Sequence, residues 1–313
     1  MKTKSIIGLD LGHSVIKLAE YSPQKKEILT LAKMVLDPEE WKQEADVYKK
    51  IAEWIKEKKQ ASASEIVLGV SAKHAILKQC ALPKAEQNIQ KAIQWELEQS
   101  LISPVEGYFF DYHLSPDSAT DELQNFSVAA LPKKNIHSIL EHFSHHDLPI
   151  TVVDIDIFAA FNALEANHPE VGSAFLLLKA DLNGIGCLAV SRKNWIRYDF
   201  IEVPANYSQL QEEEERTSSI EAISNQWGSL LKSIFANEKE EKPTHVFSCG
   251  DLLEDEDLMQ GIQSAFPLEW SPIQSFQNVS FPHEKEQQEQ IAKMAPHCAT
   301  AVGLSLRFKG DDS

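Results

Sequence analysis

The chain has little glycine, with 12 glycines in 313 residues, or about 4% against roughly 7% in average proteins. Loops that cradle phosphate depend on glycine, because only a backbone without side chains comes close enough to the phosphate oxygens. The shortage therefore argues against a working nucleotide-hydrolysing site. Cysteine is also rare: Cys80, Cys187, Cys249 and Cys298 are widely separated and form no C-x-x-C pair. This pattern fits neither a disulfide framework nor a zinc knuckle, and it indicates reduced core cysteines in a cytosolic compartment.

The chain also lacks long apolar runs and an excess of positive charge. No stretch reaches about 18 consecutive apolar residues, so we expect no direct membrane insertion, and any membrane contact would come through a partner. Lys and Arg number 30 against 47 Asp and Glu, which gives a formal net charge of -17 at pH 7. Nucleic acids and anionic lipid surfaces are bound by clustered Lys and Arg, so this balance argues against a nucleic-acid ligand.

The amino-terminal stretch KSIIGLDLGHSVIKLAEY, residues 4–21, contains two apolar runs that predict strands. The turn between them carries Asp10, Gly12 and Ser14, and a third strand is predicted at 28–36. Because Asp10 interrupts the first apolar run, we expect a first strand here and not a signal peptide. Helical periodicity then predicts amphipathic helices at 38–59 and 89–101.

The second half of the chain begins like the first. The stretch SAFLLLKADLNGIGCLAVSRKNWIRYDFIEV, residues 173–203, again predicts a strand, an Asp-containing turn, a strand, a polar turn and a strand. Asp181 follows Asp10 by 171 residues (181 minus 10). Two similar strand units with helices after them predict an α/β fold with two lobes and a cleft between them. The polar segment at 167–173 is the expected boundary.

Several segments, spread from residue 6 to 307, resemble a known group of proteins. The opening pattern is filled by Gly8, Asp10, Gly12, Ser14, Ile16 and Lys17, and further anchors are Pro83, Glu96, Ile102, Pro104, Asp111, VDIDIFAAFNAL at 153–164 and ATAVGLSLR at 299–307. In this order the anchors resemble the actin-like ATPase superfamily. Within it they are similar to PilM, the cytoplasmic actin-like component of type IV pilus machines, and more distantly to GspL of type II secretion.

The resemblance implies an actin-like (ribonuclease H-like) two-lobe α/β fold with duplicated mixed β-sheet units and a small inserted α+β domain. The implied division places the first lobe at 1–166, completed by 296–310, the insert at about 82–148 and the second lobe at 167–295.

It also implies a nucleotide site, with ATP and Mg²⁺ as cofactors, held by one Asp-Gly hairpin from each lobe. In the first hairpin Asp10 would be the carboxylate on the Mg²⁺ side, Gly12, His13 and Ser14 the phosphate cradle, and Lys17 a charge toward phosphate. Carboxylate oxygens are the ligands that magnesium prefers. Asp154 and Asp156 are further candidates to position metal or water, or else they cap the following helix.

The second hairpin departs from the family pattern, and two alignments stay open. If Asp181 is the acid, Asn183 stands where the family has glycine; otherwise Ala180 replaces the acid and Leu182 replaces the glycine. The adenosine-side turn is reduced to Ser248-Cys249-Gly250-Asp251, in which Gly250 is kept and the bulky Asp251 follows it. We therefore expect a degenerate site in which hydrolysis is more doubtful than binding.

The expected function is that of a PilM- or GspL-like scaffold of a type IV pilus or type II secretion platform. It would be cytoplasmic, held at the inner face of the inner membrane by the short tail of a bitopic PilN- or GspL-like partner, and linked to the assembly ATPase. Tyr108, Phe109 and Phe110 are the expected contacts with that tail, unless they are simply core. A small-molecule kinase or ATPase of the same superfamily and an FtsA-like filament protein are the alternatives.

Overall fold

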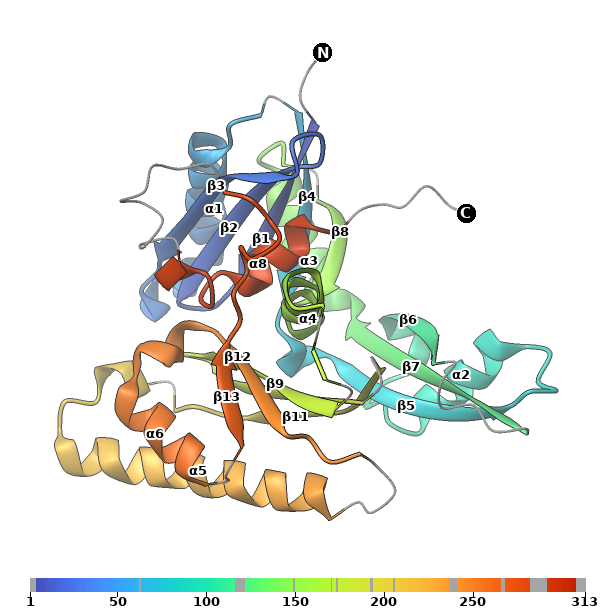
Figure 1. Cartoon of the computed structure of the whole chain (residues 1–313). Coiled ribbons are helices and arrows are strands. Elements are labelled where there is room, and N and C mark those ends of the chain that lie inside the picture. The colour runs from blue at the N-terminus through green and yellow to red at the C-terminus, as the bar shows by residue number, and fades with distance from the viewer. Residues whose placement is uncertain are drawn as a thin grey trace.

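The computed structural model has three β-sheets with helices packed on them (Figure 1). The residues that it describes are 4–61, 63–115, 122–148, 150–169, 171–172, 174–191, 194–204, 206–236, 241–265, 268–281 and 292–307. Within these ranges, no helix combines the length and the apolar character needed to cross a bilayer.

The first sheet has five strands in the order β3-β2-β1-β4-β8. They are β1 (Lys4–Leu11), β2 (Val15–Ser22), β3 (Glu27–Val35), β4 (Ala63–Val70) and β8 (Ile150–Ile155). One face packs against α1 (Glu44–Lys58) and α3 (Lys133–Ser144), with Ile7, Leu9, Ile51 and Phe143 fully buried between them. The other face receives α4 (Asp156–Asn167) and the C-terminal helix α8 (Ala299–Ser305), which lie against each other.

The second sheet repeats this topology. Its order is β11-β10-β9-β12-β13, with β9 (Ala174–Asp181), β10 (Gly184–Ser191), β11 (Asn194–Ile201), β12 (His245–Cys249) and β13 (Glu269–Pro272). In both sheets an antiparallel three-stranded unit is extended by two parallel strands. The long helix α5 (Glu213–Phe235) and α6 (Glu256–Ser264) cover one face, and Trp227 of α5 is fully buried there. The duplicated mixed sheets confirm the predicted fold class.

A third, smaller sheet projects from the side of the molecule (Figure 1). Its order is β5-β7-β6, all antiparallel, with β5 (Ile76–Pro83), β6 (Tyr108–Ser115) and β7 (Leu123–Pro132). Helix α2 (Ile89–Glu98) packs on one face and buries Ile93 and Leu97 against Phe126 and Val128. Short 3₁₀ turns η2 (Ala72–His74) and η3 (Val105–Gly107) precede β5 and β6.

Some element boundaries differ from the sequence-based expectation. The helix expected over 38–59 is a 3₁₀ helix, η1 (Pro38–Gln43), followed by α1, because Asp37 and Glu40 form a capping box that fixes the first turn. Strand β8 ends at Ile155, and Asp156 opens α4. After β12 the chain makes a 3₁₀ turn, η6 (Asp251–Glu254), before α6 begins.

The approach of α8 to the first sheet depends on Gly8 in the middle of β1. A Cβ at Gly8 would lie 2.0 Å from the backbone oxygen of Ala301, where no side chain can move aside. We expect Gly8→Ala to lower the free energy of unfolding by about 2 kcal/mol or more, the range typical of overpacked cores. Urea unfolding measures it. The matched control is Gly172→Ala, because a Cβ there meets nothing within 4 Å. Equal stability of the two variants would contradict the packing argument.

Candidate functional site

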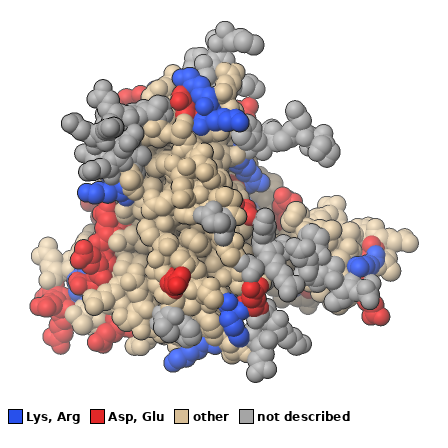
Figure 2. Space-filling view, in the orientation of Figure 1, with Lys and Arg blue, Asp and Glu red and all other residues tan. Residues whose placement is uncertain are grey.

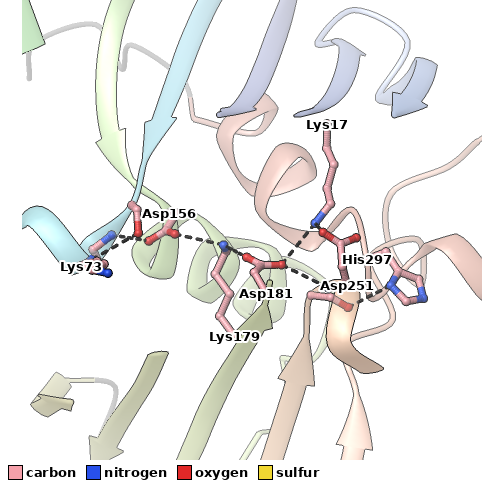
Figure 3. A network of polar contacts seen from close by, with 10 residues as sticks. Lys17, Lys73, Asp156, Lys179, Asp181, Asp251 and His297 are labelled. Carbon is pink, nitrogen blue, oxygen red and sulfur yellow. Dashed lines mark hydrogen bonds and ion pairs between the residues drawn. The ribbon is translucent and has the colours of Figure 1, made fainter. Parts of the chain in front are cut away.

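The strand ends of the two large sheets face each other across a cleft, and charged side chains fill it (Figure 3). From the first sheet come Asp10 of β1 and Lys17 of β2, which are cross-strand neighbours. From the second sheet come Lys179 and Asp181, two residues apart and therefore on the same face of β9. Asp251 enters at the end of β12, and Asp156 enters at the start of α4.

Lys17 joins the two sheets. Its Nζ lies 2.8 Å from Oδ2 of Asp251 and 3.4 Å from Oδ1 of Asp181, and its side chain is only 2% exposed. Burial disfavours the ammonium, but the carboxylates of Asp181 and Asp251 outweigh it and hold the pKa of Lys17 above its ordinary value. Lys17 therefore stays charged and stays paired with acids of the opposite sheet.

Lys179 makes a second set of ion pairs. Its Nζ lies 3.0 Å from Oδ2 of Asp156 and also contacts the carboxylate of Asp181. The other oxygen of Asp156 accepts a hydrogen bond of 2.8 Å from the backbone N–H of Ala72. Burial alone would raise the pKa of Asp181, yet Lys17 and Lys179 together hold it well below its usual range. Asp181 thus connects both lysines, and it also accepts the backbone N–H of Asp251 at 3.1 Å.

Asp10 differs from the other acids of the cleft. It is 4% exposed, and none of the described residues lies within hydrogen-bond or ion-pair distance of its carboxylate. Burial raises the pKa of Asp10 to about 6, against the opposing pull of Lys179 and Lys17. The cavity that Asp10 lines with Gly12, Ser14 and other cleft residues has a volume of only about 10 Å³, roughly the room for one water molecule.

The first hairpin is fixed by contacts of its backbone oxygens and of the His13 ring. The backbone oxygens of His13 and Ser14 accept from Trp41 Nε1 (2.5 Å) and from the N–H of Leu36 (2.8 Å), and the His13 ring stacks on Trp41. Gly12 lies in a tight turn, where a Cβ would come within 2.3 Å of the Val15 oxygen. These contacts hold the first hairpin against η1.

The backbone N–H and oxygen of Gly250 both have partners within the protein. Its N–H donates to the Pro296 oxygen at 3.1 Å, and its own oxygen is 2.9 Å from Nδ1 of His297. Gly250 has a φ of 111°, and a Cβ there would lie 2.2 Å from the Ala180 oxygen. Glycine is thus required for the close approach of two backbone segments. In the turn between β9 and β10, Leu182 and Asn183 line the same cavity as Asp10.

Of the three acids expected to hold metal, Asp10 and Asp156 enter the cleft, whereas Asp154 has partners elsewhere. Asp154 pairs with Arg307, just after α8, and accepts the N–H of Ile155, whereas Asp156 pairs with Lys179. No group of three or more His, Cys, Asp or Glu side chains that could hold a metal ion occurs within the described ranges.

Neither Lys179 nor the pairing role of Asp251 was predicted from the sequence. The signal for Lys179 was the alternation Lys-Ala-Asp at the end of a strand, which places both charged residues on one face.

The three aromatic residues at the start of β6 do not share an environment. Tyr108 is buried against the α2 side of the small sheet, and Phe110 packs partly into the same core. Phe109 points to the opposite face and is 43% exposed. Its ring meets His137 of α3 edge-on at 5.4 Å, and the Nζ of Lys133 lies 5.3 Å from the ring centroid. Of the three, Phe109 is the only one that is more than partly exposed.

The fold and the cleft define the class of protein. The structure resembles the cytoplasmic domain of EpsL, an inner-membrane component of the type II secretion system of Vibrio cholerae, with a TM-score of 0.54 and 12% identity over 97% of this chain and 96% of that one. It resembles a Bacteroides thetaiotaomicron protein with an actin-like ATPase fold and unknown function, with a TM-score of 0.53 and 10% identity over 98% and 97% of the two chains. The chain thus has the actin-like fold.

The family follows from two further comparisons. The structure of a PilM-PilN type IV pilus biogenesis complex matches with a TM-score of 0.83 and 19% identity over 96% of this chain and 98% of that one. The family model described as type IV pilus assembly protein PilM matches residues 8–177, which is more than half of the chain. This chain belongs to the PilM family. A search of curated proteins found no match.

Removal of the Lys17 charge should destabilise the fold. In Lys17→Met the buried carboxylates of Asp181 and Asp251 lose their cross-sheet cation, and breaking a buried pair from one side costs about 3–5 kcal/mol. Urea unfolding at pH 7.5 gives the loss. Lys33→Met is the control, because Lys33 is exposed on β3, and it should change stability by less than about 0.5 kcal/mol. Asp251→Asn added to Lys17→Met should recover part of the loss, and no recovery would contradict the assigned pairing.

Asp10 should make stability depend on pH. Because its folded pKa of about 6 lies above the ordinary 3.8, the folded state favours the protonated acid, and stability is lost as pH rises from about 4 through 6. Asp10→Asn cannot ionise. We expect it to gain about 2 kcal/mol over the native chain at pH 7.5 and much less at pH 4.0, measured by urea unfolding at both pH values. A gain that is the same at both pH values would contradict this assignment.

Proposed function

We propose that this chain is a non-hydrolysing scaffold of a type IV pilus or type II secretion platform. It binds the cytoplasmic tail of a bitopic membrane protein of the PilN or GspL type and links it to the assembly ATPase. This places it in the cytoplasm at the inner face of the inner membrane. We also propose a division into lobes at 1–166 with 296–310 and at 167–295, with an insert at about 82–148; the small sheet itself runs from Ile76 to Pro132.

The observation that carries the proposal is the internal neutralisation of the cleft. Lys17 and Lys179 bind Asp156, Asp181 and Asp251, so the positive charges that would meet phosphate and the carboxylates that would hold Mg²⁺ neutralise each other. With room for about one water molecule beside Asp10, this donor set does not fit a magnesium nucleotide. The kinase alternative needs a general base. Of the four cleft carboxylates, those of Asp156, Asp181 and Asp251 are paired with lysine.

The similarity to a PilM-PilN complex supports a partner of this type. That complex contains PilM and PilN, and this chain is of the PilM family. Cytoplasmic segments next to membrane spans are enriched in Lys and Arg, and the net charge of -17 is complementary to such a tail. On the face seen in Figure 2, acidic side chains gather toward the lower left, over the end of the second sheet where α5 and α6 lie.

We place the tail at Phe109, where β6 meets α3. An aromatic side chain that is partly exposed, flanked by Lys133 and His137, offers an apolar anchor with polar groups beside it. Tyr108 and Phe110 would support this anchor from the core side, and they would not contact the tail themselves.

The nucleotide part of the proposal is tested by calorimetry with ATP and Mg²⁺, followed by a phosphate-release assay. We expect no heat of binding at ATP concentrations up to about 1 mM, corresponding to less than about 4 kcal/mol of binding free energy, and no turnover. Micromolar binding with turnover by the native chain would show an active ATPase and end the proposal.

The partner part is tested with synthetic tails of membrane proteins encoded beside this chain. We expect Phe109→Ala to weaken binding of the cognate tail at least tenfold in fluorescence titration, the effect of losing about 1.4 kcal/mol. Leu123→Ala is the matched control, since Leu123 is 40% exposed in the same sheet and lies at the far end of β7. If no tail binds, or if both variants bind as the native chain does, the assigned contact is wrong.

A further inference from the structure

The outer edge of β6 has no strand partner among the described residues. The small sheet has two edges, and its β5 edge lies against β11, where Gln79 Nε2 donates to the Trp195 oxygen at 2.5 Å. Strand β6 pairs with β7 over all eight of its residues without a bulge, and its sequence YFFDYHLS contains no Pro or Lys. Bulges, proline and lysine are devices by which proteins protect an edge from pairing, and β6 has none of them. Its one charged acid, Asp111, accepts the backbone N–H of Tyr112 at 2.8 Å.

Exposed apolar side chains gather around this sheet. Among the described residues seven large hydrophobic side chains are exposed, and six of them lie in or beside the small sheet: Trp95, Ile102, Phe109, Tyr112, Leu114 and Leu123. Tyr112 and Leu114 are 37% and 42% exposed and share a face with Tyr108 and Phe110. Helix α2 packs over β5 on that face and leaves the far half of β6 uncovered.

We propose that β6 pairs antiparallel with β6 of a second copy of this chain, about a twofold axis at Tyr112. A twofold axis perpendicular to the sheet keeps both copies of α2 on the same face and makes one continuous six-stranded sheet. In this register Tyr112 lies opposite its own copy, and Phe110 lies opposite Leu114 of the second copy. The uncovered apolar side chains of β6 thereby gain apolar cross-strand partners.

The charges on the other face select the same register. With Tyr112 at the centre, Asp111 of each copy lies opposite His113 of the other, which gives two favourable pairs. A shift that centres Asp111 on the axis would place two carboxylates directly opposite each other, and a shift that centres His113 would pair the two histidines. Like charges directly opposite are destabilising, so self-complementarity favours the central position of Tyr112.

Cysteine cross-linking tests the register directly. The native Cys80, Cys187, Cys249 and Cys298 are all buried, so an introduced surface thiol reacts without their interference. We expect Tyr112→Cys to form a disulfide-linked dimer on mild oxidation, because directly opposed residues come within disulfide distance. Asp111→Cys alone and His113→Cys alone should form no disulfide cross-link, since diagonal neighbours lie too far apart. The two variants should cross-link when mixed, because residues 111 and 113 lie directly opposite each other. Equal cross-linking of all three single variants would overturn the register.

Sedimentation velocity from about 1 to 200 μM tests the association itself. We expect the native chain to dimerise within this range, and Tyr112→Lys to weaken the dimer at least tenfold by placing two cations on the axis. His113→Asp should also weaken it, and Asp111→Lys added to His113→Asp should restore it. A native chain that is monomeric throughout, a dimer indifferent to Tyr112→Lys, or pairing of β6 only with a membrane-protein tail would each overturn the proposal. Circular dichroism of every variant confirms folding.

Discussion

The arrangement of this molecule depends on one buried cation. Lys17 reaches from the first sheet into the second and pairs with Asp181 and Asp251, in a place where an unpaired ammonium would be too costly to keep. The pairing works only if the ends of β2, β9 and β12 stay close together. The ion pairs of Lys17 with Asp181 and Asp251 therefore hold the cleft at a fixed width.

The proposed loss of nucleotide binding rests on the same interaction. An actin-like cleft is closed over a nucleotide by cations that meet phosphate and by carboxylates that meet magnesium. Here Lys17 and Lys179 meet Asp156, Asp181 and Asp251 instead, so protein carboxylates occupy the electrostatic position of the phosphates. Gly250 is retained for a structural reason, because Ala180 leaves no room for a Cβ. Keeping a family glycine therefore says nothing about keeping the ligand.

The fold was predictable from the sequence because it is repeated. Two strand–turn–strand units with Asp10 and Asp181 at their turns require two similar sheets, and the structure has them. The site was less predictable. Alternation along β9 places Lys179 and Asp181 on one face, but only the tertiary structure shows that Lys17 from the other sheet meets the same carboxylate. Likewise, three consecutive aromatics on β6 look alike in sequence, and the position of α2 makes Tyr108 core and leaves Phe109 exposed.

A scaffold benefits from a cleft closed by its own side chains. Buried ion pairs are screened little by salt, so the width of the cleft changes little with ionic strength or nucleotide level. Contacts at the surface behave differently, since attraction between an acidic protein and a basic membrane-proximal tail weakens as salt rises. The proposed scaffold thus combines a permanent electrostatic interaction in its interior with an adjustable one at its surface. In this proposal, partners come and go without changing the shape they bind.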